Sequence, residues 1–179
     1  MSGFPAQVTD VPLHARPIGR SCVTNYRSPG GAPYRQCQVE IDGLLHPAIA
    51  RHGTHPTSQE HFAFADFDVV SGLTGVGAHW LARENAFDAP ALLQSVVEFL
   101  AVLVGGDTSL PPRWHTPVRL LAREWMQREF PFGNLNSGLA HSIPGPLALL
   151  SWVHANGMQV AGLQAAIERA APWAGYKSM

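Results

Sequence analysis

Charged residues, cysteines and long apolar runs are all scarce in this chain of 179 residues. Charged residues make up 14% and the formal net charge is −1, so nothing in the charge favours nucleic acid or an anionic membrane as a partner. The longest apolar stretch, residues 89–104, is interrupted by Gln94, Ser95 and Glu98, and no stretch has the length of a transmembrane helix. The opening residues MSGFPAQVTD also lack the pattern of a secretory signal. We therefore expect a cytoplasmic protein.

The chain has only two cysteines, Cys22 and Cys37, and both lie in a segment without clear patterning. In a chain without a secretory signal they are expected to be reduced. Prolines and the pair Gly30-Gly31 interrupt any long helix before residue 60. The apolar content of 46% is enough for one packed core. We predict an irregular segment at residues 1–60 and a folded part at residues 61–179.

Apolar spacing after residue 60 predicts helices and almost no strand. Asp88 is a suitable N-cap for one helix, and Pro172 is expected to close the last one. The expected helices span about residues 73–84, 89–104, 120–129, 146–155 and 160–171. The pattern predicts an all-α fold built from helical hairpins.

Two glycine-rich turns each come directly before an apolar helix. Residues 71–77 have the sequence SGLTGVG, and residues 137–139 repeat its first three letters. A repeated turn and helix is typical of stacked helical units. The second turn carries His141, whose imidazole can take up or release a proton near neutral pH. A surface histidine beside a helix cap is the alternative interpretation.

Three segments of the folded part have motifs of a known kind: residues 66–77 (DFDVVSGLTGVG), 113–117 (RWHTP) and 132–157 (FGNLNSGLAHSIPGPLALLSWVHANG). In this order and spacing they resemble signatures of the lanthipeptide cyclases, the LanC-like proteins, over about residues 61–173. The resemblance implies an α/α toroid, in which an inner ring of helices is wrapped by an outer ring. It also implies that turns at one end line the active site, here with Gly72, Gly75, Gly138 and Gly145.

Members of this family close thioether rings in dehydrated precursor peptides, and the resemblance implies the same role here. A peptide cysteine, as its thiolate, adds to a dehydroalanine or dehydrobutyrine, and a zinc ion activates the thiolate. By motif match, His141 and Asp68 would act in proton transfer around the enolate. We expect both side chains to face a common cavity. The sequence leaves open which of them is the acid and which the base.

The chain departs from the family pattern at the zinc site. The family binds zinc through two cysteines and a histidine from a later part of the toroid, whereas Cys22 and Cys37 precede the first signature. No zinc ligand set is identifiable, and Ser142 replaces a usual glycine. The chain therefore resembles the middle of a longer family member. It is predicted to be an incomplete cyclase or, alternatively, a non-catalytic peptide-binding or scaffold remnant.

Besides the precursor peptide, the alternatives for a partner are a dehydratase and a second copy of the chain. An incomplete toroid would leave apolar helix faces without neighbours. We therefore expect the isolated chain to aggregate, or to associate with itself or a partner, through faces that carry Leu147, Leu149, Leu150 and Val153.

Two other patterns are weaker. Residues 51–53 (RHG) are similar to an element of histidine phosphatases, but Pro47 disfavours the buried strand that precedes it in such enzymes. The second pattern is a histidine-rich patch without a recognised metal-ligand arrangement, so loop histidines are expected. It consists of His46, His52, His55 and His61.

Overall fold

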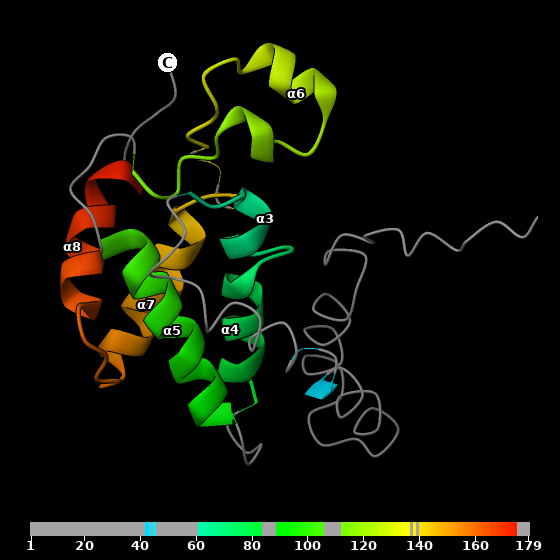
Figure 1. Ribbon diagram of the computed structural model, residues 1–179. Coiled ribbons are helices and arrows are strands. Elements are labelled where there is room, and N and C mark those ends of the chain that lie inside the picture. Colours follow the sequence, from blue (N-terminus) through cyan, green and yellow to red (C-terminus); the bar gives the residue numbers. More distant parts are fainter. Residues whose placement is uncertain are drawn as a thin grey trace, which may run out of the picture.

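The computed structural model describes residues 42, 43, 45, 61–83, 89–105, 112–136, 138 and 140–174. Helices dominate these ranges, and their only β-structure is an isolated antiparallel bridge between Thr116 and Asn134, so the predicted all-α class is confirmed. None of the described helices is both long and apolar enough to span a membrane. The elements in Figure 1 are α3 (Phe64–Phe67), α4 (Leu73–Leu81), α5 (Ala89–Gly105), η2 (Val118–Leu120), α6 (Glu124–Glu129), α7 (Pro144–Ala155) and α8 (Leu163–Ala174).

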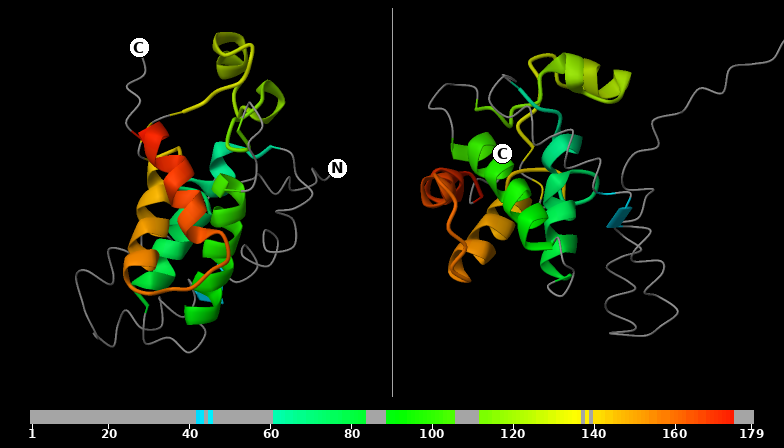
Figure 2. Two further views of the ribbon diagram at one scale, coloured as in Figure 1. Left: turned by 90° about the vertical axis from the view of Figure 1, so that its left-hand side faces the viewer. Right: turned by 60° about the horizontal axis from the view of Figure 1, so that its bottom comes forward.

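The long helices form two hairpins that pack against each other (Figure 2). α4 packs on α5 and α7 packs on α8, while contacts between α4 and α7 and between α5 and α8 join the two hairpins. The two glycine-rich turns lie at the beginnings of α4 and α7. The backbone N–H of Val69 donates to the carbonyl of Ala140 at 3.1 Å and links these turns directly. α4 and α7 therefore run parallel, with both turns at the same end.

The core lies between these four helices. Apolar residues at steps of three and four in α5 are buried, including Val97 and Leu100, which have no exposed surface. Gly77 lets α4 approach α7 closely, because a Cβ atom there would lie 2.5 Å from Cδ2 of Leu149. A larger side chain at this position would require the side chain of Leu149 to shift.

The expectation of unpartnered apolar faces on α7 is wrong at three of the four residues named for it. Leu149, Leu150 and Val153 are at most 6% exposed and belong to the core, and Leu147 packs partly buried against it. The reason is that α7 contacts α4, α5 and α8 together, so its apolar side is covered within this chain.

The last helix differs from the prediction at both ends. α8 begins at Leu163 and continues through Pro172 to Ala174. Proline near a helix end removes one intrahelical N–H donor without breaking the earlier turns. The ring of Trp173 packs edge-on against Trp114 at a centroid distance of 5.8 Å, and this contact favours the additional turn.

Two short elements also differ from the prediction. The helical piece expected over residues 120–129 is divided into η2 and α6, and α3 was not expected at all. α3 begins where the carboxylate of Asp66 accepts a hydrogen bond from the N–H of Ala63 at 2.9 Å. A helix of a single turn is too short to give an apolar periodicity in the sequence.

Three described residues of the N-terminal segment are helical, although the sequence predicts no regular structure there. They are Asp42, Gly43 and Leu45, and Leu45 is 1% exposed within the same core. Cys22, Cys37, the RHG motif and the histidines at 46, 52 and 55 lie outside the described residues.

Candidate functional site

Asp68 is held by the turn that connects α3 to α4. Its side chain is 0% exposed. Its Oδ1 accepts hydrogen bonds from the backbone N–H of Gly72 at 2.8 Å, from the N–H of Ser71, and from the Ser71 hydroxyl at 2.9 Å. A carboxylate that accepts several donors from one turn has a single orientation. The other oxygen, Oδ2, is thereby directed toward the second glycine-rich turn.

Gly72 is required by this geometry. A Cβ atom at this position would lie 2.7 Å from the carbonyl carbon of Phe67 and closer still to the backbone nitrogens of Phe67 and Asp68. The hydroxyl of Thr74 also donates to the carbonyl of Phe67 and closes the turn. The SG pair therefore lets the backbone fold back tightly enough for two consecutive N–H groups to reach Asp68.

His141 lies opposite Asp68, at the end of the second turn. Its Nδ1 is 2.6 Å from Oδ2 of Asp68, and its side chain is 46% exposed. The ring of Phe64 packs edge-on against the imidazole at 5.9 Å. Because an ionised carboxylate only accepts hydrogen bonds, Nδ1 carries the hydrogen and Nε2 of the neutral ring has a free lone pair. The exposed imidazole can therefore exchange a proton through Nε2.

The structure thus brings together the two residues that the motifs singled out, although they are 73 positions apart. The expectation that both would face a cavity is wrong for Asp68. Its carboxylate is buried, and it contacts His141 through one hydrogen bond. Only the imidazole of this pair is accessible to another molecule.

The other residues proposed for the site have different surroundings. Gly75 and Gly145 are buried in the first turns of α4 and α7. Gly138 is exposed, and its N–H donates to Oδ1 of Asn136 at 2.7 Å. Ser142 is 2% exposed, and its carbonyl accepts from the N–H of Gly145. A role for these glycines in lining the site remains a prediction.

The RWHTP element joins the end of the molecule that carries the two turns. Trp114 is 5% exposed, and the hydroxyl of Thr116 donates to the carbonyl of Phe62 at 3.2 Å. Thr116 also pairs with Asn134 in the isolated bridge. His115 Nε2 lies 2.9 Å from the carbonyl oxygen of Phe132. These contacts fix the polypeptide that leads into the second turn.

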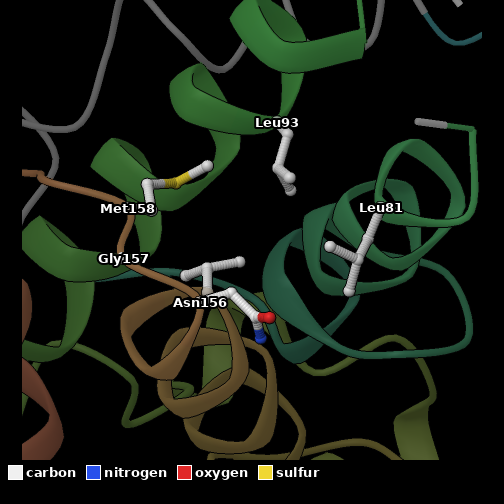
Figure 3. A pocket seen from close by; sticks show the side chains of 6 residues that line it. Leu81, Leu93, Asn156, Gly157 and Met158 are labelled. Atoms are coloured by element: carbon white, nitrogen blue, oxygen red, sulfur yellow. The ribbon is translucent and has the colours of Figure 1, made fainter. Parts of the chain in front are cut away.

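An apolar hollow of about 290 Å³ lies at the opposite end of α4 and α7 (Figure 3). It is separated from the imidazole by the length of these helices, since its lining comes from their last turns, from the residues that follow α7 and from Leu93 of α5. The lining residues are Leu81, Leu93, Val153, Asn156, Gly157 and Met158. The hollow therefore does not belong to the His141 site.

The zinc implied by the family resemblance has no matching ligands in the described part of the chain. There, no group of three histidine, cysteine, aspartate or glutamate side chains is arranged to hold a metal ion. His141 and Asp68 bond to each other as a pair. No step of the chemistry below is therefore assigned to a metal.

Sequence reasoning did not single out two residues of the site. The Ser71 hydroxyl lies 2.9 and 3.0 Å from the two oxygens of Asp68, and Phe64 supports the imidazole. Ser71 had a local signal, because a serine three residues after an aspartate can bond to it within a turn. Phe64 had none, since its contact depends on the tertiary fold.

Comparison with known proteins identifies the fold. Neither a family model nor a curated protein matches the sequence. Among solved structures, nisin cyclase is similar with a TM-score of 0.72 and 19% sequence identity. The match covers 86% of this chain and 37% of nisin cyclase. The chain therefore has the fold of part of an α/α toroid, as the sequence predicts.

Proposed function

We propose that this chain acts in thioether ring formation on a dehydrated precursor peptide and that His141 moves the proton. The observation that carries the proposal is the 2.6 Å contact between Nδ1 of His141 and buried Asp68, which leaves the imidazole half exposed. The fold shared with nisin cyclase supports the same reaction class. At 19% identity that likeness concerns the fold, so the catalytic roles depend on the geometry of this pair.

The reaction needs one proton removed and one delivered. The cysteine thiol of the peptide loses its proton, and its sulfur forms a bond to Cβ of the dehydroamino acid as the carbon–carbon π bond breaks. The resulting enolate then takes up a proton at Cα. His141 can serve at either step, because neutral Nε2 accepts a proton and the imidazolium returns one. Asp68 is a positioning residue that orients the ring and stabilises its charged form.

The substitution His141→Asn tests this role. Ring formation on a dehydrated precursor peptide is followed by mass spectrometry after alkylation of unreacted thiols. We expect a rate lower by about 10²–10⁴-fold, the usual contribution of general acid–base catalysis. His154→Asn is the matched control, because His154 is an exposed histidine in the last turn of α7. Equal rates for His141→Asn and the unchanged protein would refute the proposal.

A non-catalytic peptide-binding or scaffold role is the second candidate. It is favoured by the absence, within the described ranges, of a three-residue metal-ligand group. Peptide binding without ring formation by the unchanged protein would support this candidate, and a dehydratase is then a further partner to test. The division of the chain at residue 60 into two parts likewise remains a proposal.

A further inference from the structure

Residues 112–136, which we call the arm, extend away from the helical bundle (Figures 1 and 2). The arm contains η2 and α6 and returns to the bundle beside its own starting point. Two backbone hydrogen bonds between Thr116 and Asn134, of 3.0 and 2.9 Å, close its base. The bond from Thr116 to Phe62 attaches this base to the segment before α3. The arm is therefore anchored at the end of the molecule that carries His141.

The arm exposes an unusual amount of apolar surface. It holds three of the four large hydrophobic side chains that are exposed within the described residues: Trp125 at 58%, Phe132 at 90% and Leu135 at 39%. The fourth is Trp152 on α7, at 56%. Large apolar side chains that are exposed within one short segment are typical of a surface that contacts a partner.

The charge of the arm indicates the chemistry of that partner. The arm has four arginines and two glutamates and thus a net charge of +2, whereas the whole chain has a net charge of −1. Three of the arginines, Arg119, Arg123 and Arg128, are exposed, and so are both glutamates, Glu124 and Glu129, so the exposed residues of the arm have a net charge of +1. A locally basic surface in a chain of nearly neutral charge attracts acidic groups.

The arm leads directly to the imidazole. The described residues between Asn134 and His141, which are Leu135, Asn136, Gly138 and Ala140, are all exposed. Only seven positions separate Asn134 from His141. A ligand lying on the arm can therefore extend along this segment to Nε2.

We propose that the arm docks an acidic segment of the peptide substrate, one that also carries aromatic or aliphatic side chains. The exposed aromatic rings contact the apolar side chains, and the exposed arginines pair with the carboxylates. This inference depends on the proposed function for the identity of the peptide as a substrate, but the docking itself is measured separately from the reaction.

The probe is a fluorescein-labelled peptide of repeated Gly-Glu-Phe-Glu units, and fluorescence anisotropy reports its binding to the full chain. Combining Trp125→Ala with Phe132→Ala should weaken binding about tenfold or more, as expected for removal of two aromatic anchors. Trp152→Ala is the matched control, because Trp152 has nearly the same exposure as Trp125, and its Kd should not change. Trp125→Ala and Phe132→Ala are both at exposed positions, and circular dichroism verifies that the variant protein is folded.

Charge is tested in two ways. Replacing the glutamates of the probe with lysine should abolish binding, and so should Arg123→Glu combined with Arg128→Glu. Unchanged binding in the arm variants, or equal binding of the lysine peptide, would overturn the inference. Size-exclusion chromatography provides a third outcome. If the arm variants convert a dimer into a monomer without weakening the binding of the probe, the inference is also overturned.

Failure of the docking surface and failure of the proposed function give different results. Arm variants should raise KM for the dehydrated precursor peptide and leave kcat unchanged, whereas His141→Asn should lower kcat and leave probe binding intact. Loss of probe binding in the arm variants together with full activity of His141→Asn would retain the docking surface and reject the catalytic role.

Discussion

The described part of the chain holds two histidine–aspartate pairs with nearly the same separation and opposite burial. Nδ1 of His141 lies 2.6 Å from Asp68, and Nε2 of His79 lies 2.7 Å from Asp42. In the first pair the carboxylate is buried and the imidazole is 46% exposed. In the second pair the imidazole side chain is 0% exposed, and the carboxylate, at 15%, also binds Arg83 at 2.9 Å.

The difference shows that the contact alone does not determine what a pair can do. An exposed imidazole held by a buried carboxylate can exchange protons with another molecule and keep its orientation. A buried imidazole is shielded from such exchange, and the bond between His79 and Asp42 ties Asp42 to the last turn of α4. The two pairs lie near opposite ends of α4, so one helix supports both a candidate reactive group and a structural tie.

Asp68→Asn should have the largest effect, because it changes the buried member of the exposed pair. An amide at this position keeps the size of the side chain, but it can direct an NH₂ group at the donors of Ser71 and Gly72. We expect the free energy of unfolding to fall by about 2–3 kcal/mol, since buried groups lose their partners. Ring formation should slow by about 10²-fold or more, because His141 loses its orienting acceptor.

Urea titrations and the ring-formation assay measure the two effects of Asp68→Asn. His154→Asn serves again as the control. A variant with normal stability and normal activity would remove the distinction between the two pairs, because Asp68 would then have no role that Asn cannot fill.

The helices that bear this site follow from local sequence. The spacing of apolar residues predicts α5 and α7, and glycine followed by an apolar run predicts α4. The motifs also singled out Asp68 and His141. That choice depended on the resemblance of the motifs to a known family. Composition and periodicity do not indicate which acidic side chain contacts which histidine.

The other features depend on contacts between distant parts of the chain. Asp42 and His79 are 37 positions apart, and nothing in either local segment predicts their contact. The last turn of α8 depends on Trp114, and the exposure of Phe132 depends on the arm leaving the bundle. Tertiary packing determines the burial at such positions, so the local sequence does not predict it.

Gly72→Ala and Gly138→Ala compare the two glycine-rich turns and should have an intermediate effect. A methyl group at Gly72 meets backbone atoms of Phe67 and Asp68, which cannot rotate away, so we expect a loss of about 2 kcal/mol of unfolding free energy. At Gly138 the same group lies 3.0 Å from Oδ1 of Asn136, the end of an exposed side chain, and should cost less than about 0.5 kcal/mol.

Chemical denaturation measures both glycine variants. Equal losses would mean that the second turn is packed as tightly as the first, and the contrast between a buried carboxylate and an accessible imidazole would then lack its structural basis.

His79→Gln should have the smallest effect, and that effect should depend on pH. Burial lowers the pKa of His79 below its ordinary value of 6.5; the hydrogen bond and the charge of Asp42 raise it in part, and Arg83 lowers it further. The unfolded chain therefore binds a proton at this residue at a higher pH than the folded chain does. As a result, unfolding becomes easier as the pH falls below about 6.5, with a slope of up to about 1.4 kcal/mol per pH unit from this group.

Glutamine keeps an N–H donor for Asp42 but cannot be protonated. We expect His79→Gln to lose about 1–2 kcal/mol of unfolding free energy at pH 7 and to reduce the acid slope below pH 6.5, with ring formation unchanged at pH 7. Urea titrations of both proteins across this pH range measure the difference in slope. His141→Asn is the informative counterpart, because it removes the imidazole of the exposed pair and should retain the acid slope that His79 produces. If His79→Gln stops ring formation while the protein remains folded, then the buried pair also serves the reaction, and the assignment of one pair to chemistry and the other to structure is wrong.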